Sequence, residues 1–331
     1  MKDNRTRRQF LKEAALIAAA VRAMGAAEAA AADKPPTKTP KIKLGKLEVS
    51  RLILGSNPFF GFAHGNPQAS GGKMRKYYTD ERIMAVLDEA AEQGIEAVWT
   101  PCYDHWIRLW NRYRKKGGKL KVWIGQPDNF GKMKEHITAC AKNGGKAICV
   151  QGCCVDSAFS KRRYDLVRQW LELIHRLGLP AGIATHQPTT HLLAEKKKLP
   201  TDFYHQCLYQ PENYSPTCRD QALATIRKLD KPVVVYKALA AGRLAPKEAF
   251  PYVLKHLRRK DGICVGVFPQ EDTDQIAENA ALMRTLSGNP GASRTAALRD
   301  RRSTVALQRR RTTGTTRHSS HRLLSGEITW E

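Results

Sequence analysis

The sequence predicts a (β/α)8 barrel, the TIM-barrel class, between residues 51 and 286. A short apolar run, a polar turn and an amphipathic helical pattern follow one another eight times. The apolar runs are continuous, which is typical of strands buried on both faces of a parallel sheet. Eight such units in about 240 residues match the size of a closed barrel. An open doubly wound sheet is the alternative, but no glycine-rich dinucleotide fingerprint follows an early strand.

Each strand is expected where apolar and β-branched residues cluster between turn residues. The runs are RLILGSNPF (51–59), IEAVWTPC (95–102), KVWIGQP (121–127), KAICVQGCC (146–154), PAGIATH (180–186), DFYHQCLYQ (202–210), PVVVYKAL (232–239) and GICVGVFP (262–269). The segments between them place apolar residues three or four apart, as in YDLVRQWLELIHRLG, and this spacing predicts helices.

The N-terminal segment, residues 1–32, has the layout of a twin-arginine export signal. It reads TRRQFLK at 6–12, followed by an alanine-rich apolar stretch and small residues suited to cleavage. Arg22 interrupts the apolar stretch, which is too short for a stable membrane span. We therefore expect the twin-arginine export machinery as a partner and a periplasmic or otherwise exported location, the alternative being an ordinary amphipathic helix. Residues 33–44 are expected to link this signal to the barrel at 45–286.

The C-terminal segment, residues 287–331, differs sharply from the rest of the chain. It contains nine arginines and no lysine, and its helical periodicity is lost. Such a composition is typical of a disordered tail. Two interpretations stay open: a basic tail that binds a polyanion, or the product of a shifted reading frame.

The net charge of +25 favours anionic ligands in general. The sequence contains no recognisable nucleic-acid-binding module, so we interpret the charge as a solvated basic surface and expect no nucleic-acid partner. The eight cysteines show neither metal-ligand spacing nor a regular disulfide framework.

Chemistry in such barrels lies at the carboxyl ends of the strands, so the residues there are the candidates for a site. They are Ser56, Asn57, Thr100, Cys102, Tyr103, Asp104, Gln126, Asp128, Gln151, Asp156, His186, His205, Gln206, Tyr209, Gln210, Glu212, Tyr236, Lys237 and Phe268.

Two of these candidates suggest specific chemistry. His186 and His205, with Asp104 or Glu212, would form a two-histidine, one-carboxylate metal site. Because alternate strand residues face opposite sides and no close histidine spacing supports the idea, we predict no metal. Lys237 follows a run of buried residues, where a desolvated lysine could form a Schiff base with a carbonyl substrate. Contact with a phosphate as a simple cation is the use we favour.

Three segments resemble the aldo/keto reductases: IKLGKLEVSRLILGSNPFFG at the start, VVVYKALAAGRL in the seventh unit and VGVFPQEDTDQIAENAALM in the last. The resemblance covers roughly residues 41–286 and implies a barrel with NADP or NAD as cofactor and a carbonyl or sugar substrate. It implies that Tyr236 stacks on the nicotinamide and Gln206 binds its carboxamide. It further places Lys237 and Leu239 at the pyrophosphate, and Glu278 and Asn279 at the adenosine.

The catalytic residues of that family do not carry over. Trp99, Gln126 and Gln151 stand where the family has Asp, Lys and His, and Asp104 stands at the tyrosine position, one residue after Tyr103. A tyrosine without a neighbouring lysine keeps a high pKa and is a poor acid. Low activity toward simple aldehydes is therefore expected.

Three functions stay open on the sequence. The first is an exported oxidoreductase-fold protein that binds NAD(P) and has an altered catalytic site. The second is a nucleotide-independent lyase, aldolase or isomerase acting on a sugar or sugar acid. The third is a non-catalytic binding barrel. The catalytic candidates are Tyr103, Asp104, His186 and Lys237.

Overall fold

The computed structural model describes residues 39–64, 67–210, 214–269 and 274–288, which belong to the first of two compact units, 1–288. The predicted export signal, the linker up to residue 38, Glu212 and the tail from residue 289 lie outside the described residues. Within these described ranges, no helix is long and apolar enough to cross a membrane.

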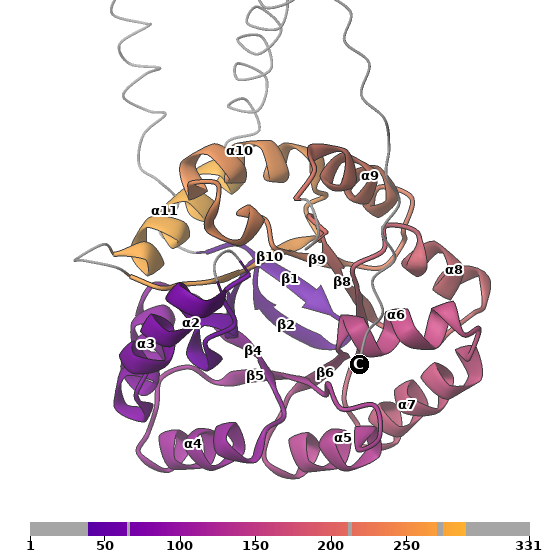
Figure 1. The fold of residues 1–331 in the computed structure, drawn as a ribbon, viewed down its shortest axis with the longest axis horizontal. Coiled ribbons are helices and arrows are strands. Elements are labelled where there is room, and N and C mark those ends of the chain that lie inside the picture. The colour runs from indigo at the N-terminus through magenta and orange to yellow at the C-terminus, as the bar shows by residue number, and fades with distance from the viewer. Residues whose placement is uncertain (1–38, 65–66, 211–213, 270–273, 289–331) are drawn as a thin grey trace, which may run out of the picture. The chain divides into compact units, whose positions relative to one another are not determined.

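Eight parallel strands form a closed barrel, which confirms the predicted (β/α)8 fold (Figure 1). Around the barrel they follow the order of the chain, and the last strand closes on the first by pairing Cys264 with Ile53. The strands are β3 (Leu52–Gly55), β4 (Ala97–Pro101), β5 (Val122–Gln126), β6 (Ala147–Val150), β7 (Ala181–Thr185), β8 (Phe203–Cys207), β9 (Val233–Tyr236) and β10 (Gly262–Gly266).

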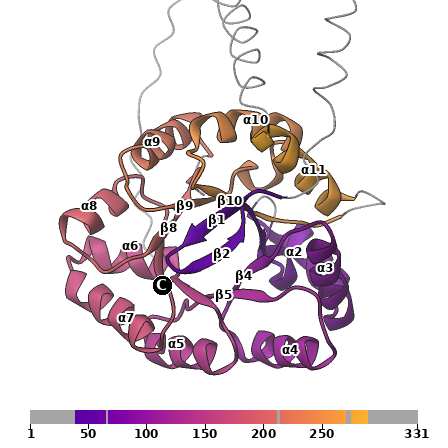
Figure 2. The ribbon, with the colours of Figure 1, turned by 180° about the vertical axis from the view of Figure 1, so that it is seen from behind.

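Helices surround the barrel, as the view from behind also shows (Figure 2). They are α2 (Pro67–Tyr77), α3 (Asp80–Glu92), α4 (Asp104–Lys115), α5 (Met133–Lys142), α6 (Gly152–Ser160), α7 (Tyr164–Arg176), α8 (Thr190–Lys196), α9 (Pro216–Ile226), α10 (Pro246–His256) and α11 (Gln275–Gly288), with short 3-10 helices η1 (Asn57–Phe60) and η2 (Ala240–Gly242). Their amphipathic pattern explains the packing. Helix α7, for example, buries Val167, Trp170, Leu171 and Ile174, spaced three or one apart on one face.

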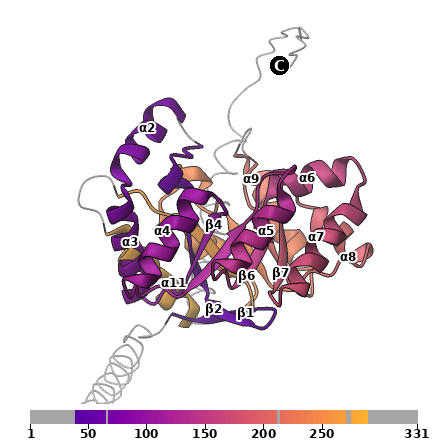
Figure 3. The same ribbon diagram turned by 90° about the horizontal axis from the view of Figure 1, so that it is seen from below.

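A hairpin that the sequence analysis does not predict covers the amino-terminal end of the barrel. It consists of β1 (Lys41–Leu44) and β2 (Leu47–Ser50), paired antiparallel. Its apolar side chains Ile42, Leu44 and Val49 belong to the same buried cluster as the barrel interior. Figure 3 shows the hairpin at one end of the barrel and α2 toward the other. The hairpin therefore leaves the opposite end of the barrel, formed by the carboxyl ends of the strands, available for a functional site.

A buried ionic network ties the strands together near the hairpin. The Asp261 carboxylate is fully buried and accepts hydrogen bonds from the backbone of Val233 at 3.0 Å and from the backbone and guanidinium of Arg258 at 2.7–2.8 Å. Arg51 donates to the backbone oxygens of Asp261 and Arg258 at 2.8 and 3.0 Å. Complete hydrogen bonding of this kind offsets the cost of removing the charges from water.

The barrel interior is filled by apolar side chains and one histidine. His205 points inward, with its ring 4.3 Å from that of Trp99 and 5.6 Å from that of Phe203. Burial lowers its pKa to about 3, so the imidazole is neutral at pH 7. This is a core position and not a position at the strand end.

Candidate active site

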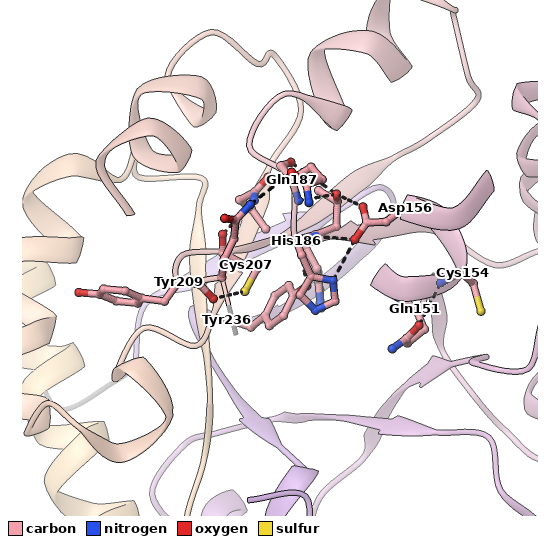
Figure 4. A network of polar contacts seen from close by, with 12 residues as sticks. Gln151, Cys154, Asp156, His186, Gln187, Cys207, Tyr209 and Tyr236 are labelled. Carbon is pink, nitrogen blue, oxygen red and sulfur yellow. Dashed lines mark hydrogen bonds and ion pairs between the residues drawn. The ribbon is translucent and has the colours of Figure 1, made fainter. Parts of the chain in front are cut away.

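The central feature at the carboxyl end of the barrel is a His–Asp pair (Figure 4). His186 follows β7, and its Nδ1 lies 2.9 Å from Oδ2 of Asp156 on α6. The same carboxylate accepts the backbone N–H of His186 at 3.0 Å and the hydroxyl of Thr185 on its other oxygen. An ionised carboxylate only accepts hydrogen bonds, so Nδ1 carries the proton and Nε2 is the acceptor nitrogen of the neutral ring. The ring is thereby oriented as a proton acceptor.

Tyr236 at the end of β9 packs against this pair. Its ring lies edge-on to His186 with 5.8 Å between centroids, and its hydroxyl donates to the Thr185 carbonyl at 2.9 Å. Gly152, the first residue of α6, approaches both closely: a Cβ there would lie 2.9 Å from His186 Cε1 and 3.1 Å from the Tyr236 hydroxyl. A side chain at residue 152 would therefore displace the pair. Burial raises the pKa of Tyr236, which keeps its hydroxyl neutral.

A cavity of about 720 Å³ lies next to Tyr236, between β9, β10 and β3. Gly55 and Gly266 are register partners on β3 and β10 and line it, so the absence of side chains there leaves room. The cavity lining includes Ser56, Asn57, His64, Trp99, Gln126, Tyr236, Lys237, Leu239, Phe268, Gln275, Glu278 and Asn279.

Five of the six residues that the family resemblance assigns to a cofactor line this one cavity. They are Tyr236, Lys237, Leu239, Glu278 and Asn279. The sixth, Gln206, is fully buried outside it and donates to the Cys207 carbonyl at 2.9 Å. Its neighbour His205 points into the barrel, so Gln206 points outward toward the helices. The structure thus separates Gln206 from the other five.

The cavity mouth is basic. Burial, and then the charge of Lys237, lower the pKa of His64 to about 4, so His64 is neutral at pH 7. Arg243 lies over the Tyr214 ring at 3.8 Å, and the Tyr214 hydroxyl donates to the His64 carbonyl at 3.0 Å. These contacts join the loops after β3, β8 and β9 around the mouth. A cationic rim of this kind favours an anionic ligand.

The loop after β9 adopts a strained backbone. Lys237, Ala240 and Ala241 have φ of 56°, 47° and 56°, in the left-handed region that non-glycine residues seldom adopt. Such conformations cost about 1–3 kcal/mol each and cluster at functional sites. The strain supports the assignment of this loop to the site.

Tyr103 and Asp104 follow β4, the neighbour of β3 in the barrel, and the Tyr103 ring packs against Phe60. The Tyr103 hydroxyl donates to Asp128 at 2.5 Å, and Nδ1 of His136 lies 3.7 Å from the other oxygen of this carboxylate. Burial and then this hydrogen bond raise the pKa of Tyr103, so it is a weak acid. Asp104 is exposed at the start of α4. Neither residue lines the cavity, and His186 and Asp156 lie beside it, behind Tyr236, rather than in its lining.

The two histidines of the metal alternative do not converge. His205 pairs in register with Ala184, two residues before His186, and its imidazole lies inside the core. Among the residues that the structure describes, no three His, Cys, Asp or Glu side chains cluster as metal ligands. Glu212 lies outside the described residues.

Asp156 is one of the predicted strand-end residues, but its pairing with His186 is not predicted from the sequence. The usable signal is topological: β6 and β7 are neighbours, so the start of α6 and the end of β7 meet. An aspartate in the first turns of α6 therefore lies within reach of a histidine that follows β7.

No family model matches this chain, and no curated protein matches it. Solved structures share its fold. Orotidine 5'-monophosphate decarboxylase from Methanocaldococcus jannaschii is 14% identical over 76% of this chain and 100% of its own, with a TM-score of 0.47. N-acetylneuraminic acid synthetase from Leptospira borgpetersenii serovar Hardjo-bovis is 13% identical over 80% and 97%, with a TM-score of 0.46. An aldolase, QR15, is 11% identical over 63% and 88%, with a TM-score of 0.40.

These similarities concern the barrel fold alone. Membership of the aldo/keto reductase family stays a prediction from the sequence, because no family model and no curated protein matches the chain.

Proposed function

We propose that this chain is a nucleotide-independent barrel enzyme that transfers a proton next to a carbonyl group of an anionic sugar or sugar acid, as isomerases, lyases and aldolases do. The observation that carries the proposal is the His186–Asp156 pair at the carboxyl end of the barrel, with Nδ1 and Oδ2 2.9 Å apart. A general base has to be positioned and oriented with an atom able to accept a proton, and an imidazole held at its other nitrogen by a carboxylate meets these requirements.

In this proposal, Nε2 of His186 removes the proton from the carbon next to the carbonyl. Asp156 keeps the ring in place and stabilises the imidazolium that forms. Lys237 at the cavity mouth holds the anionic group of the substrate as a cation. The alternative role of Lys237, a Schiff base with the carbonyl carbon, is distinguished by borohydride, which reduces the imine and leaves the substrate attached to the lysine.

Deuterium exchange tests the proposal without knowledge of the final product. A panel of sugar phosphates and sugar acids is incubated with the protein in D2O, and exchange of carbon-bound protons is followed by NMR. We expect exchange with the wild type and a loss of about 10²–10⁴-fold in His186→Asn, as for removal of one positioned base.

His175→Asn is the matched control. His175 also pairs with a carboxylate, Asp202, at 2.8 Å, but it lies in the last turn of α7 and away from the cavity. Exchange should be unchanged in this variant. Equal rates in His186→Asn and wild type, or no exchange with any member of the panel, would contradict the proposed function.

A second candidate, a nucleotide-binding oxidoreductase-like barrel, is favoured by one specific observation. Tyr236, Lys237, Leu239, Glu278 and Asn279 line a single cavity. Titration with NADPH and NADH by calorimetry tests this candidate. Lys237→Met should weaken nucleotide binding, and the loss of affinity should be smaller at high salt, because salt already screens the attraction between the lysine and the phosphates. Absence of binding at millimolar nucleotide rules this candidate out.

We also propose export through the twin-arginine route, on the pattern of residues 6–12. Replacement of Arg7 and Arg8 by lysine should leave a folded precursor in the cytoplasm. Unchanged export of this double variant would contradict the proposal.

A further inference from the structure

Two cysteines that are distant in the sequence meet behind the strand ends. Cys102 directly follows β4, and Cys140 lies on the buried face of α5. Both are buried, with 2% and 0% of their surface exposed. Both are reduced in the structure.

Gly125 on β5 makes this approach possible. A Cβ on Gly125 would lie 2.2 Å from the sulfur of Cys140 and 3.2 Å from the sulfur of Cys102, so both sulfurs surround the same point. Gly145 leaves further room, since a Cβ there would lie 2.3 Å from the Cys140 sulfur. Burial and then the neighbouring Cys140 thiol raise the pKa of Cys102, which agrees with two thiols lying close together. Two sulfurs held around one point are a precondition for a disulfide, which also needs Cα atoms about 4.4–6.8 Å apart.

We propose that Cys102 and Cys140 form a disulfide when the chain folds in an oxidising medium, and that this bond fastens the end of β4 to α5. The proposal is independent of the function argued above, because neither cysteine belongs to the His186 site or lines the cavity.

The bond forms by exchange with a small-molecule disulfide such as oxidised glutathione. The thiolate of one cysteine attacks the glutathione disulfide, forming a mixed disulfide and releasing one glutathione thiolate. The second cysteine thiolate attacks the protein sulfur of the mixed disulfide, which forms the Cys102–Cys140 bond and releases a second glutathione. Two protein thiols are thus oxidised, and one glutathione disulfide is reduced to two thiols.

Burial decides when this exchange occurs. In the folded chain, burial and the neighbouring Cys140 and Asp128 raise the pKa of Cys102 well above that of a free thiol, and a protonated buried thiol exchanges slowly. The same burial would shield the finished bond from reductants. The cross-link is therefore acquired during folding and then retained.

The experiment is refolding of the wild-type chain from guanidinium chloride, in parallel with oxidised and reduced glutathione or with dithiothreitol. Free thiols are then alkylated under denaturing conditions, and unreduced peptides are mapped by mass spectrometry. We expect a linked pair of peptides containing Cys102 and Cys140, two hydrogens lighter than their sum, only after oxidative refolding. The thermal midpoint should rise by roughly 5 °C or more relative to the reduced form.

Variants sharpen the test. Cys102→Ala should abolish the redox-dependent rise of the midpoint, whereas Cys218→Ala, a half-buried cysteine on α9, should retain it. Alkylation of both Cys102 and Cys140 after oxidative refolding would overturn the proposal, as would a bond between either one and another cysteine, such as Cys149 or Cys264 inside the barrel. Peptide mapping of the wild type decides the matter even if Cys102→Ala does not fold.

Discussion

Asp261 and Asp156 each bind a basic side chain, but the two pairs lie at opposite ends of the barrel and differ in what they can do. Each carboxylate accepts a backbone N–H and a basic side chain. Asp261 is fully buried and binds Arg258, a guanidinium that does not exchange its charge, whereas the Asp156 side chain is 19% exposed and binds His186, an imidazole that can accept and release a proton. The first pair can only hold the strands together, while the second can also exchange a proton. The distinction follows the general division of such barrels into a stabilising end and a chemical end.

The largest effect is expected from Asp261→Asn. The change leaves the Arg258 guanidinium largely buried without its charge partner, which typically costs about 3–5 kcal/mol. Denaturant unfolding should show this loss in the free energy of unfolding, and Asp156→Asn should lose much less, because its pair is partly solvated. Equal losses in the two variants would remove the distinction between the two ends.

A large effect on chemistry, with little effect on stability, is expected from Asp156→Asn. The amide no longer fixes the His186 tautomer or stabilises the imidazolium, so proton exchange into D2O should fall by roughly 10²–10⁴-fold. Folded Asp261→Asn protein should keep the wild-type rate per molecule. If both variants lose exchange to the same degree, the loss reports on general disturbance of the barrel and not on the His186 site.

Between the two ends, His205 should make stability depend on pH. Its pKa is about 3 in the folded state and about 6.5 in the unfolded state, so the unfolded chain binds the proton more tightly. The contribution to stability is complete above about pH 6.5 and falls by about 1.4 kcal/mol per pH unit as the pH decreases toward 3.

Denaturant unfolding at pH 7 and pH 5 measures this slope. In His205→Phe the slope should decrease but not vanish, because His191 is also buried with a pKa lowered to about 3. An unchanged slope in His205→Phe would show that His205 is not the group responsible.

The smallest effect on chemistry is expected from Tyr103→Phe. The Tyr103 hydroxyl is bound to Asp128 and not to the His186–Asp156 pair, so proton exchange should change by less than about twofold. The lost hydrogen bond to a charged group should cost about 1.5–3 kcal/mol of stability. A tenfold or larger loss of exchange would move the catalytic site to the β4–β5 side of the barrel.

The sequence by itself determined the secondary structure of the barrel and the set of residues at its carboxyl end. Continuous apolar runs such as Val233–Val235 predict buried strands. Apolar residues three or four apart, as in α7, predict amphipathic helices, and both patterns are local. The eightfold alternation then predicted closure. His186, Tyr236 and Lys237 were identified as strand-end residues for the same reason.

Only the tertiary structure decided which side chains meet. The Asp156–His186 pair spans 30 positions of sequence, and the Cys102–Cys140 contact depends on the packing of α5 onto Gly125. Gln206 and His205 are adjacent but face opposite sides of β8, so a shift of one residue decides whether a side chain enters the core. The β1–β2 hairpin is not predicted because its strands, KIKL and LEVS, mix charged and apolar residues and lack the continuous apolar runs of the barrel strands. Register, closure and helix packing depend on contacts between residues that are far apart in the sequence. A pattern of neighbouring residues therefore does not predict them.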